Sequence, residues 1–179
     1  MNTTNTELQT IPQVFNNAVA RYGSRVSMRT KHLGLWHDIS WNEYHAKVEK
    51  IGAALASMGL EKGDAACIIG DNSFEWVMAD MGIQCIGGIS AGIYATNAWQ
   101  QVQYVVDHSD AKFLFAENEE QLDKWLVFRD EAPNLKKIII WDNKGLTSFK
   151  DPMVMTFDQL LELGEEVLKE NPKLFEQRQ

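Results

Sequence analysis

The chain has 179 residues, of which 45% are hydrophobic, and its 17 basic and 25 acidic side chains give a formal net charge of −8 at pH 7. This length supports one well-packed core, and the composition is that of an ordinary globular protein. The negative charge argues against a nucleic acid as the main partner, because a polyanion binds to a basic face.

The first residues and the cysteines favour a protein of the reducing cytoplasm. MNTTNTELQT has neither the basic region nor the apolar core of a secretory signal, and residues 1–9 are predicted to form a flexible tail. Cys67 and Cys85 lie in apolar runs and are expected to be buried free thiols. The uncharged segment 81–95 is too short to span a bilayer, so no transmembrane segment is expected.

Helix starts are marked along the whole chain by capping boxes. In this motif a small polar residue and a Glu or Gln three positions later satisfy each other's backbone N–H groups. The pattern occurs at Thr10/Gln13, Ser40/Glu43, Asn72/Glu75, Asn97/Gln100, Asn118/Gln121 and Thr156/Gln159. Each match precedes a stretch with helical apolar periodicity, so six helices are predicted.

Between these helices lie short runs typical of β-strands. Residues 26–30 and 35–40 are predicted to pair as a hairpin around Gly34. Four further runs, 65–70, 88–93, 111–117 and 136–142, show little alternation, as expected of strands covered on both faces. Their regular alternation with helices predicts an α/β fold: a mostly parallel sheet with flanking helices and an amino-terminal β-hairpin. Segment 143–155 is predicted to be a loop.

The stretch 88–92, GISAG, matches the G-x-S-x-G nucleophile elbow of hydrolases. A true elbow leads from a strand through the serine into a helix, whereas Ser90 is predicted to follow a helix and to begin a strand. The histidine and acid downstream, His108 and Asp107, are neighbours on a predicted helix and point about 100° apart. Ser90 is therefore not expected to be a nucleophile, and no catalytic residue is assigned.

Other familiar sites are missing from the sequence. The P-loop and the G-x-G-x-x-G fingerprint do not occur, and the histidines lack the spacing of metal ligands. Asp64 and Asp71 flank a predicted strand but do not supply the acids of a phospho-receiver, and Asp71 is expected to help cap the next helix. The aromatic residues near two helix starts are interpreted as core anchors rather than as a stacking cluster: Phe74, Trp76, Tyr94 and Trp99.

Several spaced motifs nevertheless resemble one family. These are G-L-x-x-G-D at 59–64, N-S-x-E-W at 72–76, G-G-I-x-x-G-I-Y-x-T at 87–96, Q-Y at 103–104 and K-x-I-I-I-W-D at 136–142. In this order they resemble the amino-terminal part of the AMP-forming acyl-adenylate synthetases, most of all the long-chain fatty acyl-CoA ligases of the bubblegum type.

The resemblance implies an enzyme that uses ATP and Mg²⁺ to adenylate a fatty acid and then transfers the acyl group to coenzyme A. The family's phosphate-binding loop, of the form Y-T-S-G-T-T-G-x-P-K, does not occur in the 179 residues. The resemblance thus implies a fragment: 10–175 as part of the large amino-terminal domain, and 176–179 as a linker before the phosphate loop. This fragment is expected to bind no cofactor or metal, to be inactive alone and to self-associate.

Four residues are candidates for a supporting role in a substrate cleft: Gly92, Tyr94, Thr96 and Asn97. They lie where a strand leads into a helix, at the kind of sheet edge that lines α/β clefts. A purely structural role, as turn and helix cap, is the favoured interpretation. The resemblance implies a cytoplasmic parent enzyme that associates peripherally with membranes. The alternative function is a free-standing, non-catalytic α/β module for binding or oligomerisation.

Overall fold

A computed structural model of the chain describes residues 9–178. The predicted tail over 1–9 therefore lies, apart from Gln9, outside the described residues. The chain divides into two compact units, 1–45 and 46–179. The boundary falls within helix α2 (Trp41–Ser57), whose first turn belongs to the first unit. The predicted extent of the partial domain, 10–175, stays a prediction.

The first unit holds helix α1 (Ile11–Tyr22) and a hairpin of strands β1 (Val26–His32) and β2 (Leu35–Ser40). The predicted capping box at Thr10 is present: its hydroxyl accepts from the Gln13 N–H at 3.3 Å, while Gln13 accepts from the Thr10 N–H at 2.9 Å. The ring of buried Phe15 packs edge-on against Tyr44, with ring centres 4.8 Å apart. The strands pair antiparallel, as predicted.

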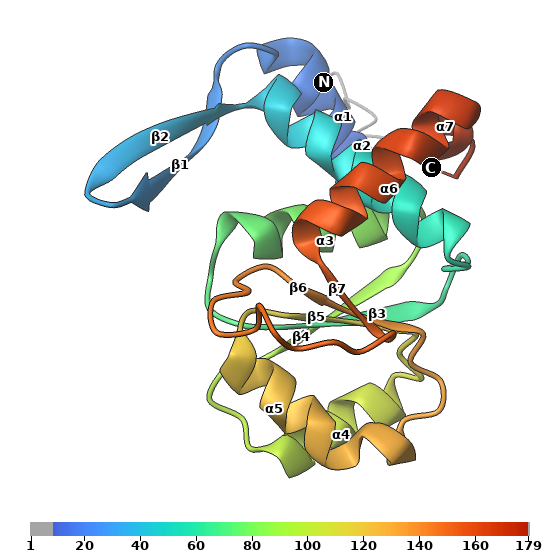
Figure 1. Cartoon of the computed structure of the whole chain (residues 1–179). Coiled ribbons are helices and arrows are strands. Elements are labelled where there is room, and N and C mark those ends of the chain that lie inside the picture. The colour runs from blue at the N-terminus through green and yellow to red at the C-terminus, as the bar shows by residue number, and fades with distance from the viewer. Residues whose placement is uncertain (1–8, 179) are drawn as a thin grey trace, which may run out of the picture. The chain divides into compact units, whose positions relative to one another are not determined.

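The second unit is a three-layer α/β structure (Figure 1). Its strands are β3 (Ala65–Ile69), β4 (Ile89–Ile93), β5 (Phe113–Ala116), β6 (Lys137–Ile140) and β7 (Val154–Thr156). They form a five-stranded parallel sheet in the order β4-β3-β5-β6-β7. Helices α4 (Trp99–His108) and α5 (Glu119–Phe128) cover one face, and α3 (Phe74–Cys85) and α6 (Phe157–Glu170) cover the other. The predicted fold class is confirmed.

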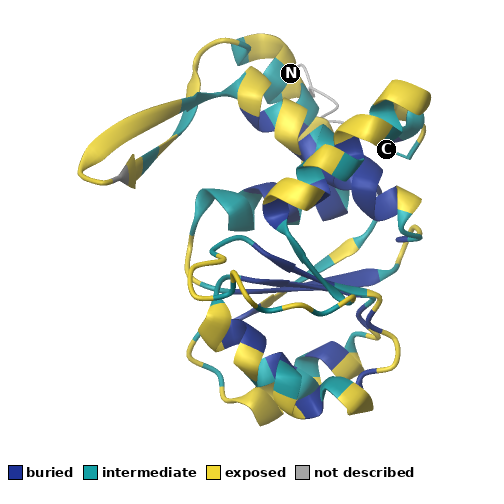
Figure 2. Ribbon diagram, in the orientation of Figure 1, coloured by how far each residue is buried: buried dark blue, intermediate teal, exposed yellow. Residues whose placement is uncertain are grey.

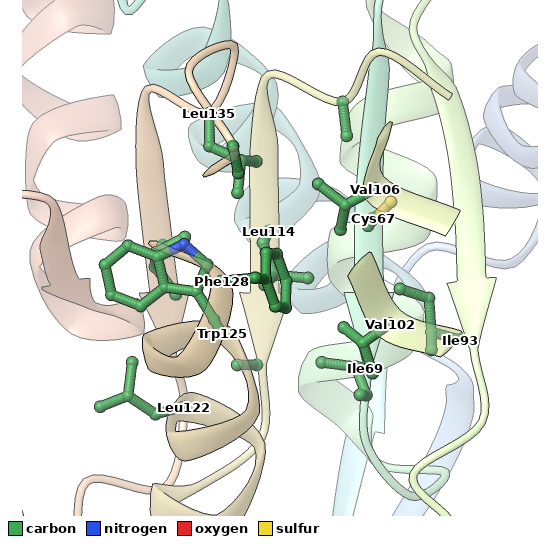
Figure 3. Packing of buried hydrophobic residues seen from close by; sticks show 14 of the residues in the cluster. Cys67, Ile69, Ile93, Val102, Val106, Leu114, Leu122, Trp125, Phe128 and Leu135 are labelled. Carbon is green, nitrogen blue, oxygen red and sulfur yellow. The ribbon is translucent and has the colours of Figure 1, made fainter. Parts of the chain in front are cut away.

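Strand residues alternate between the two faces and build a core on each side. Toward α4 and α5 point Cys67, Ile69, Leu114, Ala116, Ile138 and Ile140. Figure 3 shows Trp125 and Phe128 of α5 and Val102 and Val106 of α4 packed against this face. The two free cysteines are buried as predicted, and burial raises the pKa of Cys67 to about 11.

The structure corrects the predicted secondary structure near the carboxyl end of the sheet sequence. The predicted loop 143–155 runs into β7, a strand of three residues that pairs with Ile138–Ile140. A run this short has no readable periodicity, and the sheet edge beside β6 makes it a strand. The described chain ends with a short helix, α7 (Leu174–Arg178), which carries the buried Phe175, and the linker over 176–179 stays a prediction.

Two predicted helix caps are displaced by one residue. α3 is capped by Ser73, whose hydroxyl accepts from the Trp76 N–H at 3.2 Å, and not by Asn72. α4 begins after Ala98, whose N–H donates to the Gln101 side chain at 3.1 Å, and not after Asn97. The boxes at Ser40 and Thr156 form as predicted. The Asn118 side chain caps α5 by accepting from the Gln121 N–H.

Helix α6 lies very close to α2. A Cβ atom added to Gly164 of α6 would lie 2.0 Å from the Lys50 carbonyl oxygen. Beside this contact, the Glu165 carboxylate accepts from Lys50 at 2.7 Å and from Lys169 at 2.9 Å. These two ammonium groups lower the pKa of Glu165 to about 2. The missing side chain at Gly164 is what lets the two helix backbones touch.

Candidate functional site

A cavity of about 430 Å³ opens at the carboxyl ends of strands β3 and β4. It lies where the loop from β3 to α3 meets the loop from β4 to α4. Its lining is Gly70, Asp71, Asn72, Trp76, Gly92, Ile93, Tyr94, Ala95 and Thr96. The carboxyl edge of a parallel sheet is where α/β proteins bind ligands, so this cavity is the candidate functional site.

The strand order places a topological switch point beside the cavity. The chain moves from β3 to β4 on one side and then crosses back to place β5 on the other side of β3. Connections leaving β3 and β5 therefore diverge, and the cavity lies next to this point, between the ends of β3 and β4. Across this point the Asp71 N–H donates to the Glu117 carboxylate at 2.7 Å. Asp71 was expected to help cap α3, whose N-cap is Ser73.

Trp76 forms the apolar wall of the cavity. The Ser73 cap fixes the first turn of α3 and directs Trp76 toward β4. A Cβ atom on Gly92 would lie 3.3 Å from Cζ2 of the indole, which is tighter than an ordinary contact. Glycine at this position leaves room for the ring while keeping the cavity open.

A partly buried lysine anchors the loop that follows β4. The Lys124 ammonium, on α5, donates to the Ala95 carbonyl at 2.6 Å and to the Gln121 side chain at 2.8 Å. The Lys124 side chain is 15% exposed, and Gln121 is buried. A hydrogen bond from a charged donor is among the stronger ones, so the loop after β4 is fixed to α5.

The lining favours an uncharged, partly apolar ligand. It combines the indole of Trp76 and the side chain of Ile93 with the amide and hydroxyl groups of Asn72 and Thr96. Among the described residues that line the cavity, one is acidic, Asp71, and none is a lysine or arginine. A polyphosphate needs cationic groups or a glycine-rich nest around it, and this cavity offers neither a Lys/Arg pair nor such a loop.

Three of the four candidate residues from the sequence lie in the lining: Gly92, Tyr94 and Thr96. Asn97 is not part of it, and its N–H donates to the Tyr94 carbonyl in a turn before α4. The interpretation of the aromatic residues as core anchors is wrong for Tyr94, which is 81% exposed, and for Trp99, which is 37% exposed.

Other lining residues were missed by the sequence reasoning: Gly70, Asn72 and Trp76. Gly70 could have been found from the sequence, because it ends the predicted strand 65–70 and a glycine in a strand indicates a close approach by other atoms. A Cβ atom there would lie 2.6 Å from the Trp141 ring and 2.7 Å from the Glu117 Cβ. Because Gly70 has no side chain, Glu117, after β5, and Trp141, after β6, can pack directly against the end of β3.

The remaining candidates do not form a site. Ser90 lies in the middle of β4, paired with Ala66, and not on a strand-to-helix turn. His108 stacks on Tyr104 with ring centres 5.5 Å apart. Within residues 9–178 no three His, Cys, Asp or Glu side chains gather as a metal site requires. None of the helices that the structure describes is both long and apolar enough to cross a bilayer.

Known proteins are similar to this chain in sequence and in fold. Long-chain-fatty-acid–CoA ligase ACSBG2 of Xenopus laevis is 34% identical over 158 residues, which is 88% of this chain and 21% of the relative. ACSBG1 of Bos taurus is 31% identical over 90% of this chain and 22% of its own length. The anthranilate CoA ligase AuaEII, solved with anthranoyl-AMP, superposes with a TM-score of 0.71 at 17% identity, over 84% of this chain and 26% of its own.

The chain thus spans about a fifth of the length of the curated relatives that it matches. At its low sequence identity, the solved ligase shares only the fold with this chain. A family described as "AMP-binding enzyme" matches residues 15–162, most of the chain. The chain belongs to the AMP-binding enzyme family.

Proposed function

We propose that this chain is the amino-terminal part of a long-chain fatty acid–CoA ligase, which converts ATP, a fatty acid and coenzyme A into acyl-CoA, AMP and pyrophosphate. The similarity to ligases of that name over about nine tenths of the chain carries the proposal. The cavity at the sheet's carboxyl edge supports it, because it supplies a part of a substrate site.

The charged cofactors of that reaction do not fit the residues present. ATP, Mg²⁺ and coenzyme A all need groups that hold phosphate or a divalent cation, namely Lys, Arg, backbone nests or paired carboxylates. The described cavity lining offers one carboxylate and no cationic side chain. No step of the reaction is therefore assigned to residues of this chain.

The cavity is suited to the uncharged acyl portion of the substrate. Gly92 keeps the space beside the Trp76 indole open, and Tyr94 and Thr96, which carry hydroxyl groups, belong to the lining. We assign these three residues to one wall of the acyl-binding cleft. Asn97, outside the lining, contributes through the turn that positions Tyr94.

ATP–pyrophosphate exchange tests the proposed function. The 179-residue chain with a long-chain fatty acid is expected to give no exchange, since it lacks the groups that stabilise charge on the transferring phosphate. A polypeptide that continues through the phosphate loop should exchange pyrophosphate only when the fatty acid is present. Exchange by the 179-residue chain alone would contradict the proposal.

A free-standing binding module is the second candidate, and the self-contained core of the second unit favours it. Thermal denaturation with added ATP or acyl-adenylate separates the two. A self-sufficient nucleotide module is stabilised by its ligand, and the stabilisation grows with the logarithm of ligand concentration above the Kd. The ligase fragment should melt at the same temperature with and without ATP.

The outer edge of β4 provides a surface for self-association. No described strand pairs with this edge, and Ile89 upon it is 55% exposed. Unpaired strand edges pair with other chains unless a charge blocks them. Sedimentation should show a mass that rises with concentration for the native chain, and Ile89→Lys should abolish the rise. Val127→Lys, at an equally exposed position on α5, should leave it unchanged.

A further inference from the structure

The tip of the β1–β2 hairpin exposes three large apolar side chains in a row. Leu33 is 89% exposed, Leu35 67% and Trp36 65%. Figure 2 shows β2 coloured as exposed from the turn over most of its length, whereas β1 alternates between exposed and intermediate residues. A run of bulky apolar residues at a turn is unusual, because turns favour Gly, Asn, Asp, Pro and Ser.

The backbone of the turn does not call for leucine. Leu33 has φ +48° and Gly34 has φ +82°, so both residues of the two-residue loop lie in the left-handed region. Such a loop favours Asn-Gly or Gly-Gly, and a bulky residue there is strained. Leu33 therefore costs the fold stability, and its exposed side chain gains nothing from packing. A strained, exposed leucine points to a contact outside the chain.

Basic residues follow directly behind the apolar tip. Lys31 pairs across the strands with Trp36, and its ammonium lies 5.7 Å from the centre of the indole ring. One pair further back, Arg29 donates to the Asp38 carboxylate at 2.7 Å. Because Asp38 neutralises Arg29, the net positive charge behind the tip is that of Lys31, so the tip and its flank form a local apolar surface with one cationic group in a chain of net charge −8.

This order of groups matches the cross-section of an anionic bilayer. Leucine side chains enter the acyl boundary, a tryptophan ring lies at the headgroup level, and lysine reaches back toward the lipid phosphates. A protein partner fits less well, since three side chains at a turn fall far short of the about 1,000 Å² that a stable interface buries. A small apolar wedge is, by contrast, sufficient for peripheral lipid contact.

We propose that the hairpin tip, Leu33 to Trp36, inserts into the surface of a membrane that carries anionic phospholipid. The insertion is independent of the proposed ligase function, because it requires neither the cavity nor any chemistry. The inserted tip would hold the chain at the membrane surface, and only the first unit would contact lipid.

Vesicle flotation tests the insertion directly. The 179-residue chain should float with vesicles of phosphatidylcholine and phosphatidylserine in equal parts, and less with phosphatidylcholine alone. Leu33→Asn should weaken binding about tenfold, the factor expected for one leucine removed from the acyl boundary. Asparagine suits the left-handed turn position, so this variant should melt no lower than the native chain. Val127→Asn, at another exposed apolar site, should bind normally.

Two further variants test the roles of the charge and of the tryptophan in membrane binding. Asp38→Asn frees Arg29 from its carboxylate and should raise affinity about fivefold for the anionic vesicles only. Trp36→Phe should keep binding but lose the shift of tryptophan fluorescence to shorter wavelength. No flotation by the native chain, equal binding by Leu33→Asn, or a Leu33→Asn effect on self-association without any lipid present would each overturn the proposal. The last outcome would identify a second copy as the occupant.

Discussion

Gly164→Ala should destabilise the second unit by at least about 2 kcal/mol. On a free helix surface, alanine in place of glycine stabilises by about 1 kcal/mol. Here the added methyl group would lie 2.0 Å from the Lys50 carbonyl oxygen and 2.6 Å from its carbon, both backbone atoms that cannot rotate away. Overpacking of this kind costs about 1–3 kcal/mol, and a backbone neighbour places the cost at the upper end.

Urea denaturation followed by circular dichroism measures this effect as a lower midpoint. Glu166→Ala serves as the control, because it lies two positions further along α6 with its side chain exposed. That exchange should change the free energy of unfolding by no more than about 0.5 kcal/mol. A Gly164→Ala protein as stable as the native chain would mean that α6 and α2 do not approach as closely as described.

Sequence patterns predicted the elements of this fold because the signals are local. The box at Thr156 forms because both of its hydrogen bonds connect residues three apart, whatever surrounds them. The box at Asn72 fails because the next residue, Ser73, offers an equally good cap one position later, and the loop from β3 decides between them. β7 was missed because only its pairing with β6 makes three residues a strand.

The candidate site was predicted only in part, because it joins segments that are distant in the chain. Tyr94 and Thr96 could be predicted from the sequence, since both lie within three residues after a predicted strand. Trp76 was not, because its place in the cavity depends on the absent side chain of Gly92, 16 positions later. The hydrogen bond between Asp71 and Glu117 likewise depends on β5 pairing with β3, which no local pattern states.

Gly92→Leu is expected to close the cavity without unfolding the protein. Gly92 lies exposed on β4, an edge strand, so the new side chain has solvent on one side and the Trp76 ring on the other. In a polypeptide that continues through the phosphate loop, the KM for a long-chain fatty acid should rise between about fivefold and 150-fold. That range corresponds to the about 1–3 kcal/mol that it costs to fit a substrate against an added side chain.

The Gly92→Leu substitution distinguishes a role of Gly92 in an acyl-binding wall from a role in the turn alone. If Gly92 served only the turn, Gly92→Leu would lower the melting temperature and reduce exchange with every substrate equally. An acyl-binding wall predicts an unchanged melting temperature and an unchanged KM for ATP, because the lining carries no group that holds phosphate. Ile89→Ala, on the same strand but outside the lining, controls for changes to β4 itself. The KM for shorter fatty acids should rise least, because they place fewer carbon atoms beside the indole. A damaged β4 strand would raise the KM without this dependence on chain length.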